Sequence, residues 1–206
     1  MLVTVLVIAA ALRLVFPTDI EFGGDQTWTF EAVRVALSGG GWPGVGMPSG
    51  VWLRNPGMSA WVFIALGWLF GADTPVELAR GVAITNLGAL SLLAVYAWRV
   101  VPRAKRELWY WAVGFAAVSP MSVIYQRKIW AQSVLPLFCV ITIIGWRHRD
   151  RLSGAFTWGL VAMILGQIHL SGFFMAAALF ILTAWTQWRG GPVDTEEPAP
   201  RRVRWS

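Results

Sequence analysis

Long apolar blocks separated by short polar stretches run through this chain of 206 residues. Within each block the apolar residues cover every helical face, a pattern typical of membrane-spanning helices and not of soluble helices with one buried stripe. The blocks long enough to cross a bilayer, or nearly so, are residues 1–16, 78–98, 108–125, 129–146, 152–168 and 170–188. The pattern therefore predicts an all-α polytopic membrane protein with about six transmembrane helices.

The longest polar region, residues 18–56, follows the first block. Apolar side chains recur on one face of a helix over residues 29–37, which predicts an amphipathic helix able to lie along the membrane. A further apolar segment, residues 57–71, is shorter than the roughly 20 residues that a crossing needs. We therefore expect it to form an interfacial or re-entrant helix on the same side as the polar region.

The distribution of basic residues indicates which loops face the cytoplasm. They concentrate in residues 99–106, in residues 147–151 and in the tail 189–206. If residues 57–71 do not cross, these three regions share one side, which the excess of Lys and Arg marks as the cytoplasm. Both termini are then cytoplasmic, and the chain is expected to be a multi-pass protein of the plasma (inner) membrane. The tail, rich in proline and charge, is expected to be disordered.

Composition limits the partners. The net charge is +6, yet the basic residues lie in short loops between apolar blocks and form no patch with aromatic platforms. This argues against nucleic acid and favours membrane lipid. Cys139 is the only cysteine, so an internal disulfide is excluded.

Polar groups that topology alone does not explain fall on the outer side in this arrangement. They are Asp25, Glu31, Arg54, Arg80, Arg127, Lys128 and His169. A positioned carboxylate can accept the proton of an attacking hydroxyl, and arginine suits bidentate contact with phosphate. Arg13, near the end of the first apolar block, is expected to snorkel to the interface.

The order of these pieces resembles the GT-C superfamily of membrane glycosyltransferases, in particular its protein O-mannosyltransferase and aminoarabinose-transferase branch. The matching pieces are Phe22-Gly-Gly-Asp25-Gln26, Arg54-Asn55-Pro56, Phe70-Gly71, Val76-Glu-Leu-Ala-Arg80, Ser119-Pro120 with Arg127 after it, and His169. None is specific by itself, and their order and spacing over residues 1–188 carry the resemblance.

The resemblance implies that residues 1–188 form a GT-C-like transmembrane module whose catalytic loop is residues 18–56. It implies transfer of a hexosyl or pentosyl group from a polyprenyl-phosphate-linked donor to an acceptor hydroxyl, with Asp25 as the catalytic general base. Candidates for binding the phosphate or sugar are Arg54, Arg80, Arg127, Lys128 and His169. Asp25 and Glu31 are also candidate ligands of a divalent metal ion, although Gln26 replaces a glutamate that the family often has there.

Other function classes remain open. A non-catalytic membrane scaffold or lipid-binding subunit fits the same pattern. A transporter fits less well, because the chain lacks a convincing internal repeat and its ionisable residues lie at helix ends. GT-C proteins usually continue with further helices, so the chain is expected to be a fragment, a natural truncation, or a subunit whose partner supplies the missing helices.

Overall fold

The structure, a computed structural model, describes residues 1–48 and 53–189. It is 75% helix with almost no sheet, which confirms the expected helical class. The α-helices within the described residues are α1 (Leu2–Leu14), α2 (Asp25–Leu37), α3 (Met58–Phe70), α4 (Pro75–Arg99), α5 (Arg106–Val118), α6 (Pro120–Tyr125), α7 (Leu135–Arg147), α8 (Leu152–Ile168) and α9 (Ser171–Trp188). Two short strands, β1 (Val45–Pro48) and β2 (Arg54–Pro56), pair as an antiparallel hairpin. Two 3-10 turns, η1 (Arg103–Lys105) and η2 (Ala131–Val134), precede α5 and α7. The predicted tail, residues 189–206, lies outside the described residues except for Arg189.

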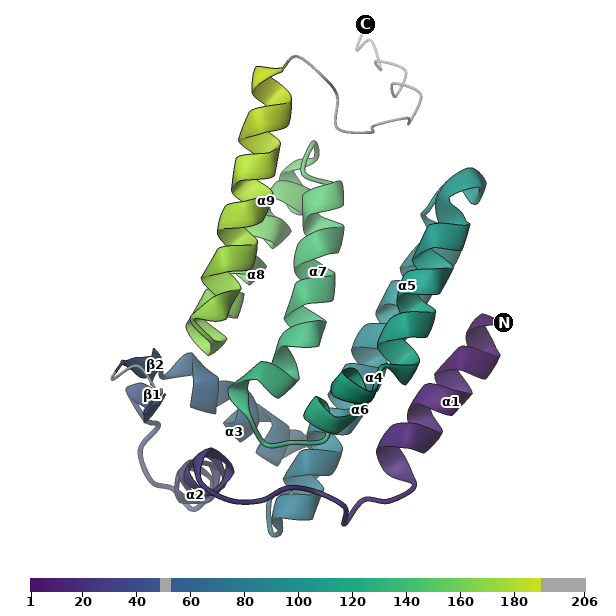
Figure 1. Cartoon of the computed structure of the whole chain (residues 1–206). Coiled ribbons are helices and arrows are strands. Elements are labelled where there is room, and N and C mark those ends of the chain that lie inside the picture. The colour runs from purple at the N-terminus through teal and green to yellow at the C-terminus, as the bar shows by residue number, and fades with distance from the viewer. Residues whose placement is uncertain (49–52, 190–206) are drawn as a thin grey trace, which may run out of the picture.

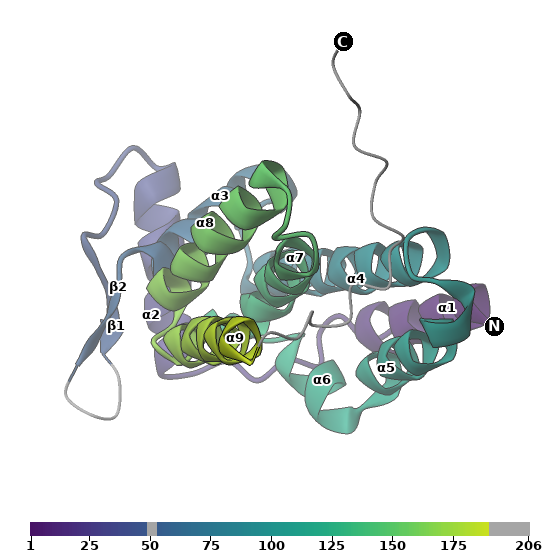
Figure 2. The ribbon, with the colours of Figure 1, turned by 90° about the horizontal axis from the view of Figure 1, so that it is seen from above.

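The helices α1, α4, α5, α7, α8 and α9 extend along the line between two ends of the molecule, and α1 covers only part of that length (Figure 1). One end carries α2, the β-hairpin, α3 and the turn between α8 and α9; we call it the α2–α3 end. The other carries the turn between α4 and α5, the turn between α7 and α8, and the last turn of α9; we call it the terminal end, and the N-terminus points toward it from about midway along the molecule (Figure 1). Seen from above, α7 lies between α4 on one side and α8 with α9 on the other (Figure 2).

Two helices within the described residues, α4 and α9, are both long and apolar enough to cross a membrane. The other apolar helices are α1, α3, α8 and the segment Ala131–Arg147, and all are shorter. With 13 residues, α1 extends about 20 Å, less than the roughly 30 Å of a hydrocarbon core. Helix length therefore supports two of the six expected crossings.

Helix α4 begins at Pro75, three residues before the predicted start at residue 78, because Thr74 and Glu77 cap it. The backbone N–H of Glu77 donates to the Thr74 hydroxyl at 3.3 Å, and the Glu77 carboxylate accepts the backbone N–H of Thr74 at 3.3 Å. This capping box satisfies two N–H groups at the helix start, and Pro75 fills the first position, where its missing N–H costs nothing. Before it, Gly71 ends α3 with φ of 89°, a backbone angle that favours glycine.

The predicted continuous helix over residues 108–125 is wrong, because the helix breaks at Ser119. The ψ angle of Ser119 is 123°, outside the helical range, and α6 begins at Pro120. Pro120 has no N–H to donate to the carbonyl of Ala116, so the hydrogen-bond ladder stops there. The break turns α6 away from α5 and leaves carbonyl groups at the end of α5 to be satisfied from elsewhere.

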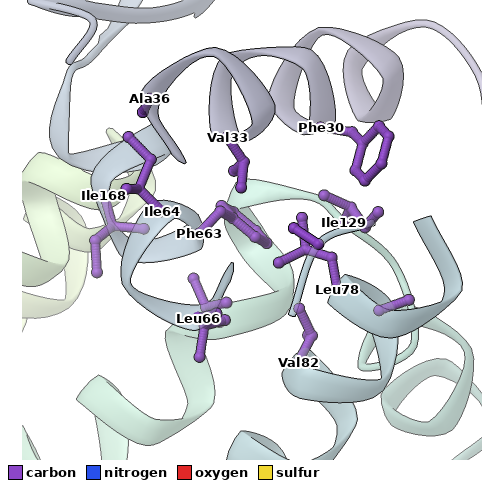
Figure 3. Packing of buried hydrophobic residues seen from close by; sticks show 13 residues of the cluster. Phe30, Val33, Ala36, Phe63, Ile64, Leu66, Leu78, Val82, Ile129 and Ile168 are labelled. Atoms are coloured by element: carbon purple, nitrogen blue, oxygen red, sulfur yellow. The ribbon is translucent and has the colours of Figure 1, made fainter. Parts of the chain in front are cut away.

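The main core lies at the α2–α3 end (Figure 3). Its labelled side chains are Phe30, Val33 and Ala36 of α2, Phe63, Ile64 and Leu66 of α3, Leu78 and Val82 of α4, and Ile129 and Ile168. Each fully buried member, such as Val33 or Phe63, contributes about 1.5–3 kcal/mol of hydrophobic stabilisation. The apolar face of α2 therefore packs on protein, and the position of this helix along the membrane stays a prediction.

Candidate functional site

Asp25 is the first residue of α2, whereas the predicted helix began only at residue 29. Gly24 precedes it with φ of 47°, which lets the chain turn into the helix. Thr29 donates its hydroxyl to the Asp25 carbonyl at 2.9 Å, and the Asp25 side chain is exposed. Within residues 1–48 and 53–189, its carboxylate has no hydrogen bond or ion pair. The helix dipole favours a negative charge at this position, and the exposed carboxylate is accessible to a molecule outside the protein.

The loop that joins α1 to α2 is fastened to the segment after α6. The guanidinium of Arg127 donates to the carbonyl of Phe16 and lies 3.6 Å from the Asp19 carboxylate. The ammonium of Lys128 donates to the Glu21 carboxylate. Both predicted phosphate-binding cations are therefore paired with acidic groups in this state of the protein.

This fastening also limits where Asp25 can lie. Asp25 follows Glu21 by four residues, so its Cα lies within about 14 Å of the Glu21 Cα. Lys128, bound to Glu21, and Asp25 therefore belong to the same region of the α2–α3 end. An anionic substrate group placed between them would have to compete with Glu21 for the Lys128 ammonium.

Three arginines from separate segments line one small cavity. Arg13 of α1, Arg80 of α4 and Arg127 surround it, together with Pro17 and Ile20 of the α1–α2 loop. Its volume of about 10 Å³ has room for roughly one water molecule. The Arg80 side chain is exposed. The structure therefore brings Arg80 and Arg127, two of the predicted anion-binding residues, to one place.

The interpretation of Arg13 as a snorkelling residue is wrong, because its side chain is only 2% exposed. Its Nε donates to Oε1 of Gln126 at 2.7 Å, and its Nη1 donates to the carbonyls of Ala117 at 2.8 Å and Ala9 at 3.2 Å. Its Nη2 donates to the carbonyl of Ala116 at 3.1 Å. Its charge therefore sits at the C-terminal end of α5, where the helix dipole favours a cation.

One signal for this role was present in the sequence. Pro120 cannot donate to the carbonyl of Ala116, so that partly buried acceptor needs another donor. Arg13 lies in an apolar block and offers five N–H donors in a rigid fork. Only the tertiary packing of α1 beside α5 brings these two requirements together.

His169 follows the last residue of α8 and links two segments. Its Nδ1 accepts the backbone N–H of Ser171 at 3.2 Å and lies 2.7 Å from the Ser171 hydroxyl. Its Nε2 lies 2.9 Å from the side-chain amide of Gln132 in η2. Burial lowers the pKa of the His169 imidazole, since it disfavours the charged ring. These contacts favour a neutral ring that holds the α8–α9 turn against η2.

Arg54 lies apart from the arginine cavity. It is an exposed residue of β2, in the hairpin that contacts α3 and α8. The hairpin and α1 lie on opposite sides of the α2–α3 end (Figures 1 and 2). The predicted set of cations is therefore divided between Arg54 on the hairpin, His169 on the α8–α9 turn, and the group around Arg127.

Asp25 and Glu31 do not fit one shared metal ion. They are six residues apart on α2, which separates them by about 9 Å along the helix and about 120° around it. Among the described residues, no group of three or more His, Cys, Asp or Glu side chains is placed to hold a metal. The groups that this site offers for chemistry are therefore its own carboxylate and its cations.

At the α2–α3 end an accessible carboxylate thus lies in the same region as a group of cations. Comparison of the chain with models of protein families, with curated proteins and with solved structures gave no match.

Proposed function

We propose that this chain is a multi-pass protein of the plasma (inner) membrane, in which α1, α4, α5, α7, α8 and α9 cross the bilayer. The first support is the surface of α9, where Phe174 is 78% and Trp188 is 80% exposed. Only 11% of this apolar helix is buried, unlike the core helix of a soluble protein. Exposed apolar surface on this scale is typical of a lipid-facing helix.

The same pattern holds on the other helices. Large apolar side chains exposed on them include Val3 and Val7 of α1, Trp111 and Phe115 of α5, and Phe156 and Met163 of α8. Polar contacts instead lie between helices: the Asn86 side chain donates to the carbonyl of Ser133 at 2.8 Å, and Trp146 donates to the Thr183 hydroxyl at 2.8 Å. Interhelical hydrogen bonds of this kind stabilise helix bundles in lipid.

The distribution of charge supports an orientation. The basic residues of the terminal end are Arg99, Arg103, Lys105, Arg106, Arg147, Arg149, Arg151 and Arg189. The α2–α3 end carries fewer basic residues among those described, namely Arg34, Arg54, Arg80, Arg127 and Lys128. Because cytoplasmic loops carry the excess of Lys and Arg, the terminal end faces the cytoplasm, as do both termini. The α2–α3 end then faces outward.

At this outer end we propose transfer of a hexosyl or pentosyl group from a polyprenyl-phosphate-linked donor to an acceptor hydroxyl. One observation carries the proposal. The accessible carboxylate of Asp25 begins α2 at the same end as Arg80, Arg127 and Lys128. A proton acceptor and a group of cations are the two features that transfer from a phosphate leaving group requires.

The proposed reaction is a single displacement. The acceptor oxygen attacks the anomeric carbon of the donor sugar and forms the new glycosidic bond, while the Asp25 carboxylate takes the hydroxyl proton. The bond between the anomeric carbon and the phosphate oxygen breaks, and its electron pair leaves with the lipid phosphate. Arg80, exposed beside the arginine cavity, stabilises the charge that develops on the phosphate. Asp25 then returns the proton to solvent.

The lipid tail of such a donor must remain in the bilayer, and the end of α3 suits that interface. Trp68, Leu69 and Phe70 are exposed there. Trp42 lies with its ring centroid 5.5 Å from Trp68 and 6.0 Å from Trp61. Indole rings favour the headgroup region of a membrane, so this tryptophan cluster supports placing α3 at the outer interface.

The experiment compares Asp25→Asn with Asp73→Asn, which neutralises another exposed carboxylate at the same end. Membranes holding the full chain receive polyprenyl-phosphate-linked hexose or pentose, and release of polyprenyl phosphate is measured. Removal of a general base slows such reactions about 100-fold or more. We expect that loss for Asp25→Asn and near-normal release for Asp73→Asn. Equal release by both variants would contradict the role of Asp25.

A non-catalytic lipid-binding subunit is the second candidate, and the pairing of Arg127 with Asp19 and of Lys128 with Glu21 favours it, because these pairs compensate the charge. In that case the wild-type chain binds the lipid-linked sugar and releases no polyprenyl phosphate. Binding then weakens in Arg80→Gln and is unaffected by Asp25→Asn.

A further inference from the structure

A second and larger cavity lies at the terminal end, between α4, α7 and α8. Its volume is about 520 Å³, within the range of small-molecule sites, and it opens to the surface. It shares no residue with the arginine cavity, whose lining comes from α1, the start of α4 and the segment after α6. It is therefore a separate feature of the fold.

Close packing of α7 on α8 forms one wall of this cavity. A Cβ atom on Gly154 would lie 1.9 Å from the carbonyl oxygen of His148, and one on Gly145 would lie 2.7 Å from the backbone nitrogen of Trp158. Both glycines line the cavity. The two backbones thus touch, and this contact fixes the position of the α7–α8 turn.

The α4 side of the cavity meets the same turn. The hydroxyl of Tyr96, a buried residue of α4, lies 3.4 Å from Nε2 of His148, and the two rings meet edge to face at 5.8 Å. His148, which lines the cavity, is thereby held against α4. The contact between Tyr96 and His148 therefore joins α4 to the α7–α8 turn beside the cavity.

The lining divides into a polar part and an apolar part. Arg151 and His148 belong to the turn, and Leu92, Ile141 and Ile144 line the cavity from positions on α4 and α7 that are farther from the turn. The Arg151 side chain is exposed, and no acidic residue of the described chain pairs with it.

Arg149, two residues before Arg151, has its guanidinium engaged by other groups of the protein. Arg149 donates to the carbonyl of Trp146 at 3.0 Å, and its guanidinium lies 4.7 Å from the centre of the Trp146 ring. Arg149 is not among the residues that line the cavity. Among the described residues that line the cavity, Arg151 is therefore the guanidinium available to an anion.

We propose that this cavity binds one anionic phospholipid, with its phosphate beside Arg151 and His148 and an acyl chain against Leu92, Ile141 and Ile144. A free phosphate would use only the polar part, and a hydrocarbon only the apolar part, whereas a phospholipid uses both. The inference rests on the proposed membrane orientation, in which this end faces the leaflet rich in anionic lipid. It is independent of sugar transfer.

The test measures lipid binding by the purified full chain in detergent, by native mass spectrometry or by lipid-induced stabilisation. The probes are phosphatidylglycerol, phosphatidylcholine and inorganic phosphate. We expect selective binding of phosphatidylglycerol, and an affinity about tenfold weaker in Arg151→Gln, the loss expected for one charge-assisted hydrogen bond. Arg103→Gln, which removes an exposed arginine of η1 outside the cavity, should bind as the wild type does.

A second variant tests the apolar part. Ile144→Trp places a larger side chain in the cavity and should weaken phosphatidylglycerol binding, with circular dichroism confirming a retained helical fold. Equal losses in Arg151→Gln and Arg103→Gln would overturn the proposal, as would phosphatidylcholine binding equally well or inorganic phosphate competing at similar concentration. Asp25→Asn should leave this binding unchanged, so failure of the transferase proposal and failure of this one are distinguishable.

Discussion

Arg13 and Gln126, 113 positions apart in the chain, are joined by a hydrogen bond of 2.7 Å in the interior of the protein. The same guanidinium also donates to the carbonyls of Ala116 and Ala117 at the end of α5. One side chain of α1 thus ties together α5 and the segment after α6, where the helical ladder is broken. Two of the cations of the candidate site, Arg127 and Lys128, directly follow Gln126.

Replacing Arg13 by Met should destabilise the protein, because it leaves buried acceptors without a donor. The loss expected for hydrogen bonds to a charged group is about 1.5–3 kcal/mol. Thermal unfolding in detergent measures it. The control is Arg34→Met, which alters an exposed residue of α2 and should change stability by less than about 0.5 kcal/mol. Equal unfolding temperatures for the two variants would contradict the structural role of Arg13.

Two glycines of α8 should respond to alanine with opposite signs. In Gly154→Ala the new Cβ would collide with the carbonyl of His148, and overpacking of this kind costs about 1–3 kcal/mol. Gly159 has no atom within 4 Å of the same position, so Gly159→Ala should stabilise the helix by about 0.5–1 kcal/mol. Unfolding measurements on both variants check the pair, and a stabilised Gly154→Ala would show that α7 and α8 do not touch there.

Stability should fall as the pH drops below the ordinary His169 pKa of 6.5. The folded protein lowers the pKa of this ring, so the unfolded chain binds the proton more readily, and protonation in that range favours unfolding. Unfolding temperatures between pH 7.5 and 5 measure the slope. His169→Gln should reduce this slope, and His148→Gln, which alters the other histidine, should retain it. If the unfolding temperature of His169→Gln falls with pH as steeply as that of the wild type, His169 is not the cause of the pH dependence.

The orientation can be tested by labelling in a background where Cys139 is replaced by Ser. A cysteine at position 25 should react with a membrane-impermeant thiol reagent added outside intact cells. A cysteine at position 104, in η1 of the terminal end, should react only after the membrane is opened. Both residues are exposed in the structure, so accessibility within the protein does not limit either reaction. The reverse pattern would refute the proposed topology.

Much of the helical layout follows from local composition. The apolar runs end at glycine, proline or charged residues, and α8 begins and ends at the predicted residues 152 and 168. The predicted short segment 57–71 contains α3, which ends at Phe70 and is followed by Gly71. The polar groups predicted to share one side of the membrane also lie on elements of one end, the α2–α3 end (Figure 1). Helices that alternate in direction, with one segment that does not run the full length, place these loops together.

Tertiary structure alone decided what each polar group contacts. The apolar block around Arg13 shows that its helix is surrounded by nonpolar material, but this material can be lipid or another helix, and the pattern of the block is the same in both cases. The pairing of Arg127 with Asp19 and the burial of Arg13 depend on partners more than a hundred residues away. Local periodicity carries no information on such partners. They are set by which helices pack together, and that packing decides which charges of the candidate site are paired and which, like Asp25 and Arg80, stay accessible.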